Sequence, residues 1–155
     1  MSFKSRIIFL AAALVVFQTV ALAYQKVDTP GMKPADKPDQ SVQIEFITPE
    51  ELKTKIAKNE PLAILDLRSQ NSYEQSDKKI TGSLRSRVRK VASRLREVPR
   101  DREVITYCAC PADQAAILAA RELLANGFTR VRVLKGGWNA WLQAGGPVQP
   151  KPRGA

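Results

Sequence analysis

From residue 42 onward, the sequence alternates between short apolar segments and longer segments whose apolar residues recur at helical spacing. The short segments are typical of β-strands and comprise residues 45–47, 62–67, 104–107 and 131–134. The helix-like segments begin at residues 48, 69, 84, 115 and 136. Strands and helices that alternate over short connections predict an α/β domain with a mostly parallel sheet. A chain of 155 residues has room for one such domain.

Two of the predicted helices carry specific sequence signals. Thr48, Pro49 and Glu51 form a capping-box pattern, in which threonine and glutamate side chains accept hydrogen bonds from each other's backbone amides. Farther along, five apolar residues recur every three or four positions and predict one amphipathic helix: Leu84, Val88, Val91, Leu95 and Val98. Pro99 ends this predicted helix.

The first 23 residues have the pattern of a secretory signal peptide. Lys4 and Arg6 give a basic start, residues 7–17 are an uninterrupted apolar run, and residues 21–23 match the small-x-small cleavage pattern. The apolar run is shorter than the roughly 20 residues that a transmembrane helix needs. We therefore expect cleavage after Ala23 and export to the periplasm or beyond, with no stable membrane insertion afterwards. An uncleaved membrane anchor is the alternative.

The remainder of the chain divides by composition. Residues 24–41 hold three prolines, three lysines and three aspartates among few apolar residues, which predicts a flexible linker. Residues 42–148 form the predicted domain, and residues 149–155 are expected to be a disordered tail.

The chain contains no histidine, and Cys108 and Cys110 are its two cysteines. These counts exclude a histidine general base and histidine metal ligands, and they argue against a closed four-ligand zinc site. We expect neither a metal nor a cofactor. The formal net charge of +10 favours anionic partners. The basic run at residues 85–102 lacks interleaved aromatic residues, so we interpret it as a solvated helix face and expect no nucleic-acid partner.

Two predicted strands end in residues that can carry chemistry. Asp66 and Arg68 lie at the end of one strand, and Cys108 and Cys110 follow another. In open α/β sheets, ligands bind beyond the carboxyl ends of the strands. A cysteine between a strand end and a helix start lies near unpaired backbone amides, which stabilise a thiolate or a persulfide. The alternative is a buried cysteine that only fills apolar space.

Residues 44–148 resemble a single rhodanese domain, the sulfurtransferase family. Four segments carry the resemblance: Leu62–Arg68 with its Asp-x-Arg ending, Ile80–Ser83, Val104–Cys108, and Val133–Trp141 with the following Gly145-x-Pro147-Val148. The resemblance implies a five-stranded, mostly parallel sheet flanked by helices on both faces. It also implies a cysteine that takes sulfane sulfur from a small anionic donor such as thiosulfate. The resulting persulfide passes this sulfur to a thiol acceptor or to cyanide.

The resemblance places the site in the loop after residue 107. Counting forward from the strand makes Cys108 the nucleophile, and we favour it because the strand fixes its position at the sheet edge. Counting back from the next helix makes the nucleophile Cys110. The residues implied to bind substrate or support the loop are Asp66, Arg68, Ala109, Cys110, Pro111, Ala112, Asp113 and Gln114.

This loop differs from the family's usual loop in having no basic residue. Arg68, or one of Arg85, Arg87 and Arg89, is the candidate to attract the anionic donor instead. The alternative is that Asp66 and Arg68 pair with each other and brace the loop. A cysteine phosphatase is disfavoured, because no arginine stands six residues after either cysteine.

Two further functions are compatible with these residues. Cys108-Ala109-Cys110 is a candidate redox pair for thiol–disulfide exchange, since a disulfide across a single residue closes a small, strained ring. The domain is also a candidate non-catalytic binding module that keeps the fold without turnover.

Overall fold

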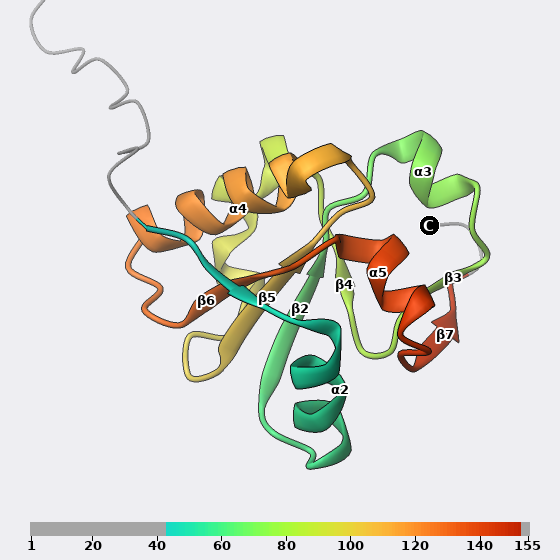
Figure 1. Cartoon of the computed structure of the whole chain (residues 1–155). Helices are drawn as coiled ribbons and strands as arrows, with labels where there is room; N and C mark the ends of the chain where they lie inside the picture. Colours follow the sequence, from blue (N-terminus) through green and yellow to red (C-terminus); the bar gives the residue numbers. More distant parts are fainter. Residues whose placement is uncertain (1–42, 153–155) are drawn as a thin grey trace, which may run out of the picture. The chain divides into compact units, whose positions relative to one another are not determined.

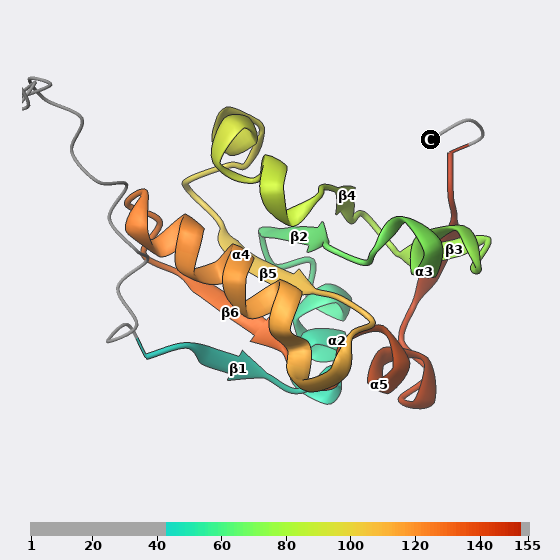
Figure 2. The same cartoon turned by 90° about the horizontal axis from the view of Figure 1, so that it is seen from above.

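The centre of the fold is a five-stranded sheet in which every neighbouring pair of strands is parallel (Figures 1 and 2). We describe residues 43–152 of a computed structural model, so the expected signal peptide and the whole of the expected linker lie outside the described residues. The strand order is β1-β6-β5-β2-β4. These strands are β1 (Glu45–Ile47), β2 (Leu62–Asp66), β4 (Leu84–Arg85), β5 (Glu103–Tyr107) and β6 (Val131–Leu134).

Helices lie on both faces of this sheet, as predicted (Figure 1). The α-helices are α2 (Pro49–Ala57), α3 (Gln70–Glu74), α4 (Gln114–Ala125) and α5 (Gly137–Gln143). The described part also contains three short 3₁₀ helices, η2 (Val88–Lys90), η3 (Ala92–Glu97) and η4 (Pro111–Asp113). Within residues 43–152, no helix is long and apolar enough to cross a membrane.

The core is divided by the sheet into two apolar clusters. Ala63 and Leu65 of β2 belong to the cluster beneath α4, whereas Ile64 between them belongs to the cluster formed with α2 and α5. This alternation is the period of two that a strand imposes on its side chains. Because both faces are covered, β2 is an almost continuous apolar run, which is why the sequence predicted it as a central strand.

The predicted start of the first helix is confirmed in detail. The Thr48 hydroxyl accepts a hydrogen bond from the Glu51 amide at 3.2 Å, and the Glu51 carboxylate accepts one from the Thr48 amide at 2.9 Å. Pro49 takes the first helical position, where its missing N–H leaves no hydrogen bond unmade.

The prediction of one amphipathic helix across residues 84–98 was wrong. Leu84 lies in β4 opposite Leu65, and the amide of Ser86 continues this pairing by donating to the carbonyl of Asp66 at 3.0 Å. Strand pairing therefore overrides the helical spacing at the start of the segment. The rest forms η2 and η3, which still turn Val91 and Val98 into the core.

The ordered chain also extends beyond the expected boundary at residue 148. Residues 148–150 form β7 (Val148–Pro150), which pairs antiparallel with β3 (Lys78–Ile80) in a separate two-stranded ribbon. The amide of Lys151 then donates to the carbonyl of Asp77 at 2.8 Å. Local composition suggested a tail from residue 149 because the partner strand lies about 70 residues upstream, where no short sequence window reveals it.

Candidate active site

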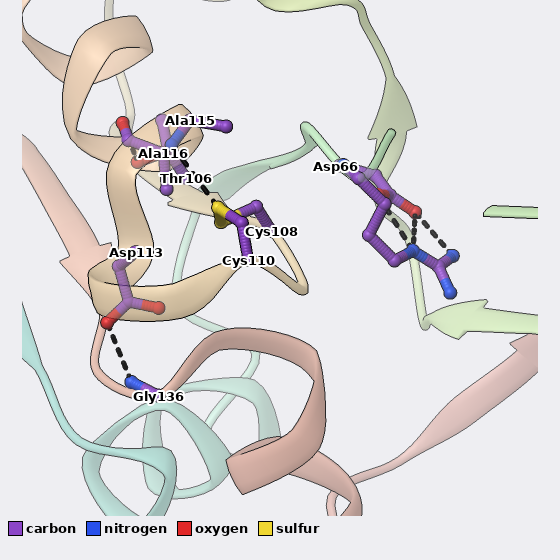
Figure 3. The surroundings of a disulfide bond; sticks show 9 residues. Asp66, Thr106, Cys108, Cys110, Asp113, Ala115, Ala116 and Gly136 are labelled. Atoms are coloured by element: carbon purple, nitrogen blue, oxygen red, sulfur yellow. Dashed lines mark hydrogen bonds and ion pairs between the residues drawn. A yellow bond between two sulfur atoms is a disulfide. The ribbon is translucent and has the colours of Figure 1, made fainter. Parts of the chain in front are cut away.

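The cysteine loop connects the end of β5 to the start of α4, beyond the carboxyl edge of the sheet (Figure 3). Cys108 follows directly after the strand, and η4 occupies the last three residues before α4. The loop contains both cysteines of the chain, and they form a disulfide with their Cα atoms 5.7 Å apart. The structure therefore brings the two candidate nucleophiles together in an oxidised pair.

The two sulfur atoms have different surroundings. Cys108 is only 1% exposed and belongs to the apolar cluster beneath α4. Cys110 is half-buried, and its Sγ accepts a hydrogen bond from the backbone amide of Ala115 at 3.3 Å. Ala115 is in the first turn of α4, where amides lack partners within the helix and the helix dipole is positive. The helix start thus acts on Cys110, the second of the two candidates, and not on Cys108.

The loop is held in a tight conformation by its last two residues. Ala112 and Asp113 both have left-handed backbone angles, with φ of 51° and 54°. Asp113 is buried, and its carboxylate accepts a hydrogen bond from the amide of Gly136 at 2.9 Å (Figure 3). Its own amide donates to the carbonyl of Cys110 at 3.3 Å. Asp113 therefore ties the cysteine loop to the turn before α5 and does not face an anionic donor.

The first residues of α5 come into direct contact with the cysteine loop. The amide of Trp138 donates to the carbonyl of Cys108 at 2.7 Å. Gly137 has φ of 52°, and a Cβ atom at this position would lie 2.1 Å from the same carbonyl oxygen. Only glycine allows this close approach. The sequence indicated a tight turn at residues 136–137, but it did not show that this turn supports the cysteine loop.

Asp66 and Arg68 form a buried ion pair at the end of the neighbouring strand. The Arg68 Nη2–Asp66 Oδ2 distance is 2.6 Å, and the Arg68 Nε lies 3.0 Å from Asp66 Oδ1. The guanidinium also packs over the rings of Tyr73 and Trp138, at 4.9 and 4.3 Å from their centroids. Arg68 is 1% exposed, so the geometry supports the bracing role and leaves it no route to a donor in solvent.

Tyr107 joins this ion pair to the strand that precedes the cysteines. Its hydroxyl donates to Asp66 Oδ2 at 2.7 Å and lies 3.2 Å from the hydroxyl of Ser83. Burial, and then the negative charge of Asp66, raise the pKa of Tyr107, so the hydroxyl stays protonated as a donor. Sequence analysis missed this residue as part of the site. The available signal was its position, because β2 and β5 place Asp66 and Tyr107 directly opposite each other.

The other predicted loop residues lie mostly at the surface. Pro111, Ala112 and Gln114 are exposed, and Ala109 is half-buried. Among residues 43–152, no three histidine, cysteine or acidic side chains are grouped so that they could hold a metal ion. A hollow of about 560 Å³ lies at the opposite edge of the sheet around Glu103 and Arg132, away from the cysteines.

Known proteins resemble this chain in both sequence and structure. The family model of the Rhodanese-like domain matches residues 48–144. A protein from Allochromatium vinosum named Sulfurtransferase is 30% identical over 102 residues, which cover 66% of this chain and 92% of that protein.

Solved structures include the Rhodanese-like domain of the Alr3790 protein from Anabaena sp., with a TM-score of 0.58, 28% identity, and coverage of 73% of this chain and 88% of that one. A protein from Rhodopseudomonas palustris, described as a possible tyrosine phosphatase, has a TM-score of 0.58 and 25% identity, with coverage of 68% and 85%. The family match spans more than half of the chain, and the five-stranded parallel sheet flanked by helices agrees with it. The chain belongs to the rhodanese-like domain family.

Proposed function

We propose that this chain transfers sulfane sulfur through a persulfide formed on Cys110. The observation that supports this choice is the hydrogen bond from the first turn of α4 to the half-buried Cys110 sulfur. A negatively charged sulfur at this position gains from the amide and from the helix dipole. The name of the relative from Allochromatium vinosum supports the class of reaction.

The reaction starts from the reduced loop, so an external dithiol first cleaves the Cys108–Cys110 disulfide and is itself oxidised to a disulfide. The Cys110 thiolate then attacks the outer sulfur of thiosulfate. The sulfur–sulfur bond of the donor breaks, and sulfite leaves with the bonding electron pair. A thiolate or cyanide acceptor next attacks the terminal sulfur of the Cys110 persulfide, and the Cys110 thiolate is regenerated.

Cys108 is positioned to resolve this persulfide to a disulfide when no acceptor is present. Its thiolate attacks Cys110 Sγ, the disulfide re-forms and hydrosulfide leaves with the electron pair. The observed disulfide shows that the two sulfur atoms can meet in the folded chain. The buried position of Cys108 suits a residue that reacts only within the protein.

The test is a thiosulfate-to-cyanide assay on the reduced full chain, with Cys110→Ser and Cys108→Ser as matched variants. We expect Cys110→Ser to abolish thiocyanate formation, and Cys108→Ser to retain it. Mass spectrometry after thiosulfate treatment should show one added sulfur in Cys108→Ser and none in Cys110→Ser. Loss of activity in Cys108→Ser alone would overturn the assignment to Cys110, and an inactive wild type would favour a non-catalytic binding module.

Thiol–disulfide exchange is the second candidate function, and the observed disulfide favours it. In this reaction the disulfide accepts two electrons from an external dithiol, and both cysteines are required. Oxidation of a dithiol peptide should then be lost equally in Cys108→Ser and Cys110→Ser. Sulfur transfer to cyanide should be lost in only one of them, so the two assays separate the functions.

The proposal also includes the cellular location of the protein. The basic start, apolar run and small-x-small pattern of residues 1–23 support export with cleavage after Ala23. An oxidising compartment would favour the disulfide between Cys108 and Cys110, so turnover there depends on delivery of a dithiol reductant.

A further inference from the structure

A hollow at the β4 side of the sheet is lined by basic side chains and by residues with buried polar groups that lack partners. Its volume is about 380 Å³. The lining residues come from α3, from β4 and the segment after it, and from η2 and η3: Gln70, Tyr73, Arg85, Ser86, Arg87, Lys90 and Arg94. Four of the seven are cationic and none is acidic. Two of the arginines that the sequence suggested as donor-attracting residues, Arg85 and Arg87, lie here, whereas Arg89 is not part of the lining.

Three hydrogen-bond donors on residues that line this hollow have no partner among the described residues. They are the hydroxyl of Tyr73, the hydroxyl of Ser86 and the Nη2 atom of Arg85. Tyr73 is 2% exposed and Ser86 is 7% exposed, so water does not readily replace the missing partners. Buried polar groups are normally hydrogen-bonded, and leaving one without a partner costs about 1–3 kcal/mol. Three such donors around one hollow therefore indicate a missing acceptor.

The charges of the hollow are only partly neutralised. Arg85 donates through Nη1 to the backbone carbonyls of Asp66 and Ser86, at 3.1 and 2.8 Å, and stacks 4.4 Å over the Tyr73 ring. Burial lowers the pKa of Arg85, and the negative charge of Asp66 acts in the opposite direction. Arg94 is paired with the exposed Glu97, and Arg87 contacts only the neutral Gln70.

We propose that this hollow binds a doubly charged tetrahedral oxyanion. Such an ion brings acceptor oxygens for the hydroxyls of Tyr73 and Ser86 and for Arg85, and its charge is matched by Arg87 and Lys90. A sulfur oxyanion such as thiosulfate and inorganic phosphate share this chemistry. The hollow is at the same edge of the sheet as the cysteines. Asp66 is opposite Arg85 on one side and Tyr107 on the other, which separates the two strand ends by about 10 Å.

The site lies at the same edge of the sheet as the cysteine loop, and its existence does not depend on the proposed sulfur transfer. Calorimetric titration of the oxidised full chain with sulfate, thiosulfate and phosphate, at constant ionic strength, tests it directly. Sulfate carries no transferable sulfur, so its binding tests the anion site alone. A failure of the anion site can therefore be distinguished from a failure of the proposed sulfur transfer. We expect saturable binding of one ion per chain, and the order of the affinities of thiosulfate and phosphate shows which source the site prefers.

Three substitutions test the residues, and a fourth is the control. Tyr73→Phe removes only the hydroxyl and should weaken binding about tenfold or more, the usual loss for a hydrogen bond to a charged group. Arg87→Gln and Lys90→Gln should each weaken it severalfold. Arg89→Gln removes the same charge from a neighbouring exposed residue outside the hollow and should leave the affinity unchanged.

Three outcomes of these titrations would contradict the proposal. Absence of saturable binding, an unchanged affinity in Tyr73→Phe, or equal losses in Lys90→Gln and Arg89→Gln would each overturn it. Because Tyr73→Phe retains the ring that stacks on Arg85, we expect the variant to fold. An unchanged urea midpoint for this variant shows that any loss of affinity comes from the hydroxyl and not from unfolding.

Discussion

Replacement of Asp66 by asparagine should destabilise this domain far more than an equivalent change at the surface. Asp66 is fully buried, and its carboxylate accepts hydrogen bonds from the Arg68 amide and guanidinium and from the Tyr107 hydroxyl. The amide of asparagine keeps one acceptor oxygen but removes the negative charge. Arg68, which is 1% exposed, then remains as a buried cation without a counterion.

The magnitude follows from that unpaired cation. Breaking a buried ion pair by removing one partner typically costs about 3–5 kcal/mol, which is a large part of the roughly 5–15 kcal/mol that stabilises a domain. Urea unfolding at neutral pH measures this loss. With a slope of about 1–3 kcal/mol per molar urea, the midpoint of Asp66→Asn should fall by at least 1 M.

Glu97→Gln is the matched control for this prediction. This substitution also replaces a carboxylate that is paired with an arginine by an amide. The Arg94–Glu97 pair is exposed, however, since 44% of the Arg94 side chain and 55% of the Glu97 side chain are accessible to solvent. Solvent screens such pairs, so its urea midpoint should stay within experimental error of the wild type. Equal urea midpoints for Asp66→Asn and Glu97→Gln would refute the argument that the buried ion pair contributes more to the free energy of unfolding than the exposed pair does.

Three further predictions follow from the described contacts and from the first segment of the sequence. Because the folded protein raises the pKa of Tyr107 above its usual 10.0, the unfolded chain loses this proton first. Unfolding free energy should therefore fall as the pH rises above about 10, with a smaller slope in Tyr107→Phe. Gly137→Ala and Gly82→Ala both place alanine at a positive φ, but only the former meets a backbone carbonyl, so it should lower the melting temperature further. Mass spectrometry of the exported protein should find Tyr24 at its start, and an intact residue 1 in the membrane fraction would contradict cleavage.

The sequence predicted the parts of the fold that depend on local patterns. The capping residues at Thr48, the apolar run of β2 and the glycine pair before α5 each act within a few positions, so a short window is enough to identify them. The same reasoning gave a wrong prediction for residues 84–98. Their apolar residues do have helical spacing, but Leu84 pairs with Leu65 of a neighbouring strand, which a short window does not reveal. The same limitation applied to Gln149, which lies in β7 because Lys79 is opposite it.

The candidate site could be located from the sequence but not resolved into roles. Order along the chain places Asp66 and Cys108 at strand ends, and parallel strands bring those ends to one edge. Spacing alone left open whether Arg68 reaches a donor or braces the loop, because this depends on its 1% exposure. The contact of Asp113 with Gly136 spans 23 residues and could not be read from either motif.

The choice between the two cysteines turns on where a negative charge can be solvated. A thiolate at Cys108 would lie in the apolar cluster beneath α4, where a charge without a partner is strongly disfavoured. At Cys110 the same charge keeps access to solvent and accepts the Ala115 amide. In the proposed reaction the two cysteines therefore have separate tasks. Cys110 holds the reactive sulfur at the helix start, while Cys108 keeps a second, buried sulfur at the strand end within reach of it.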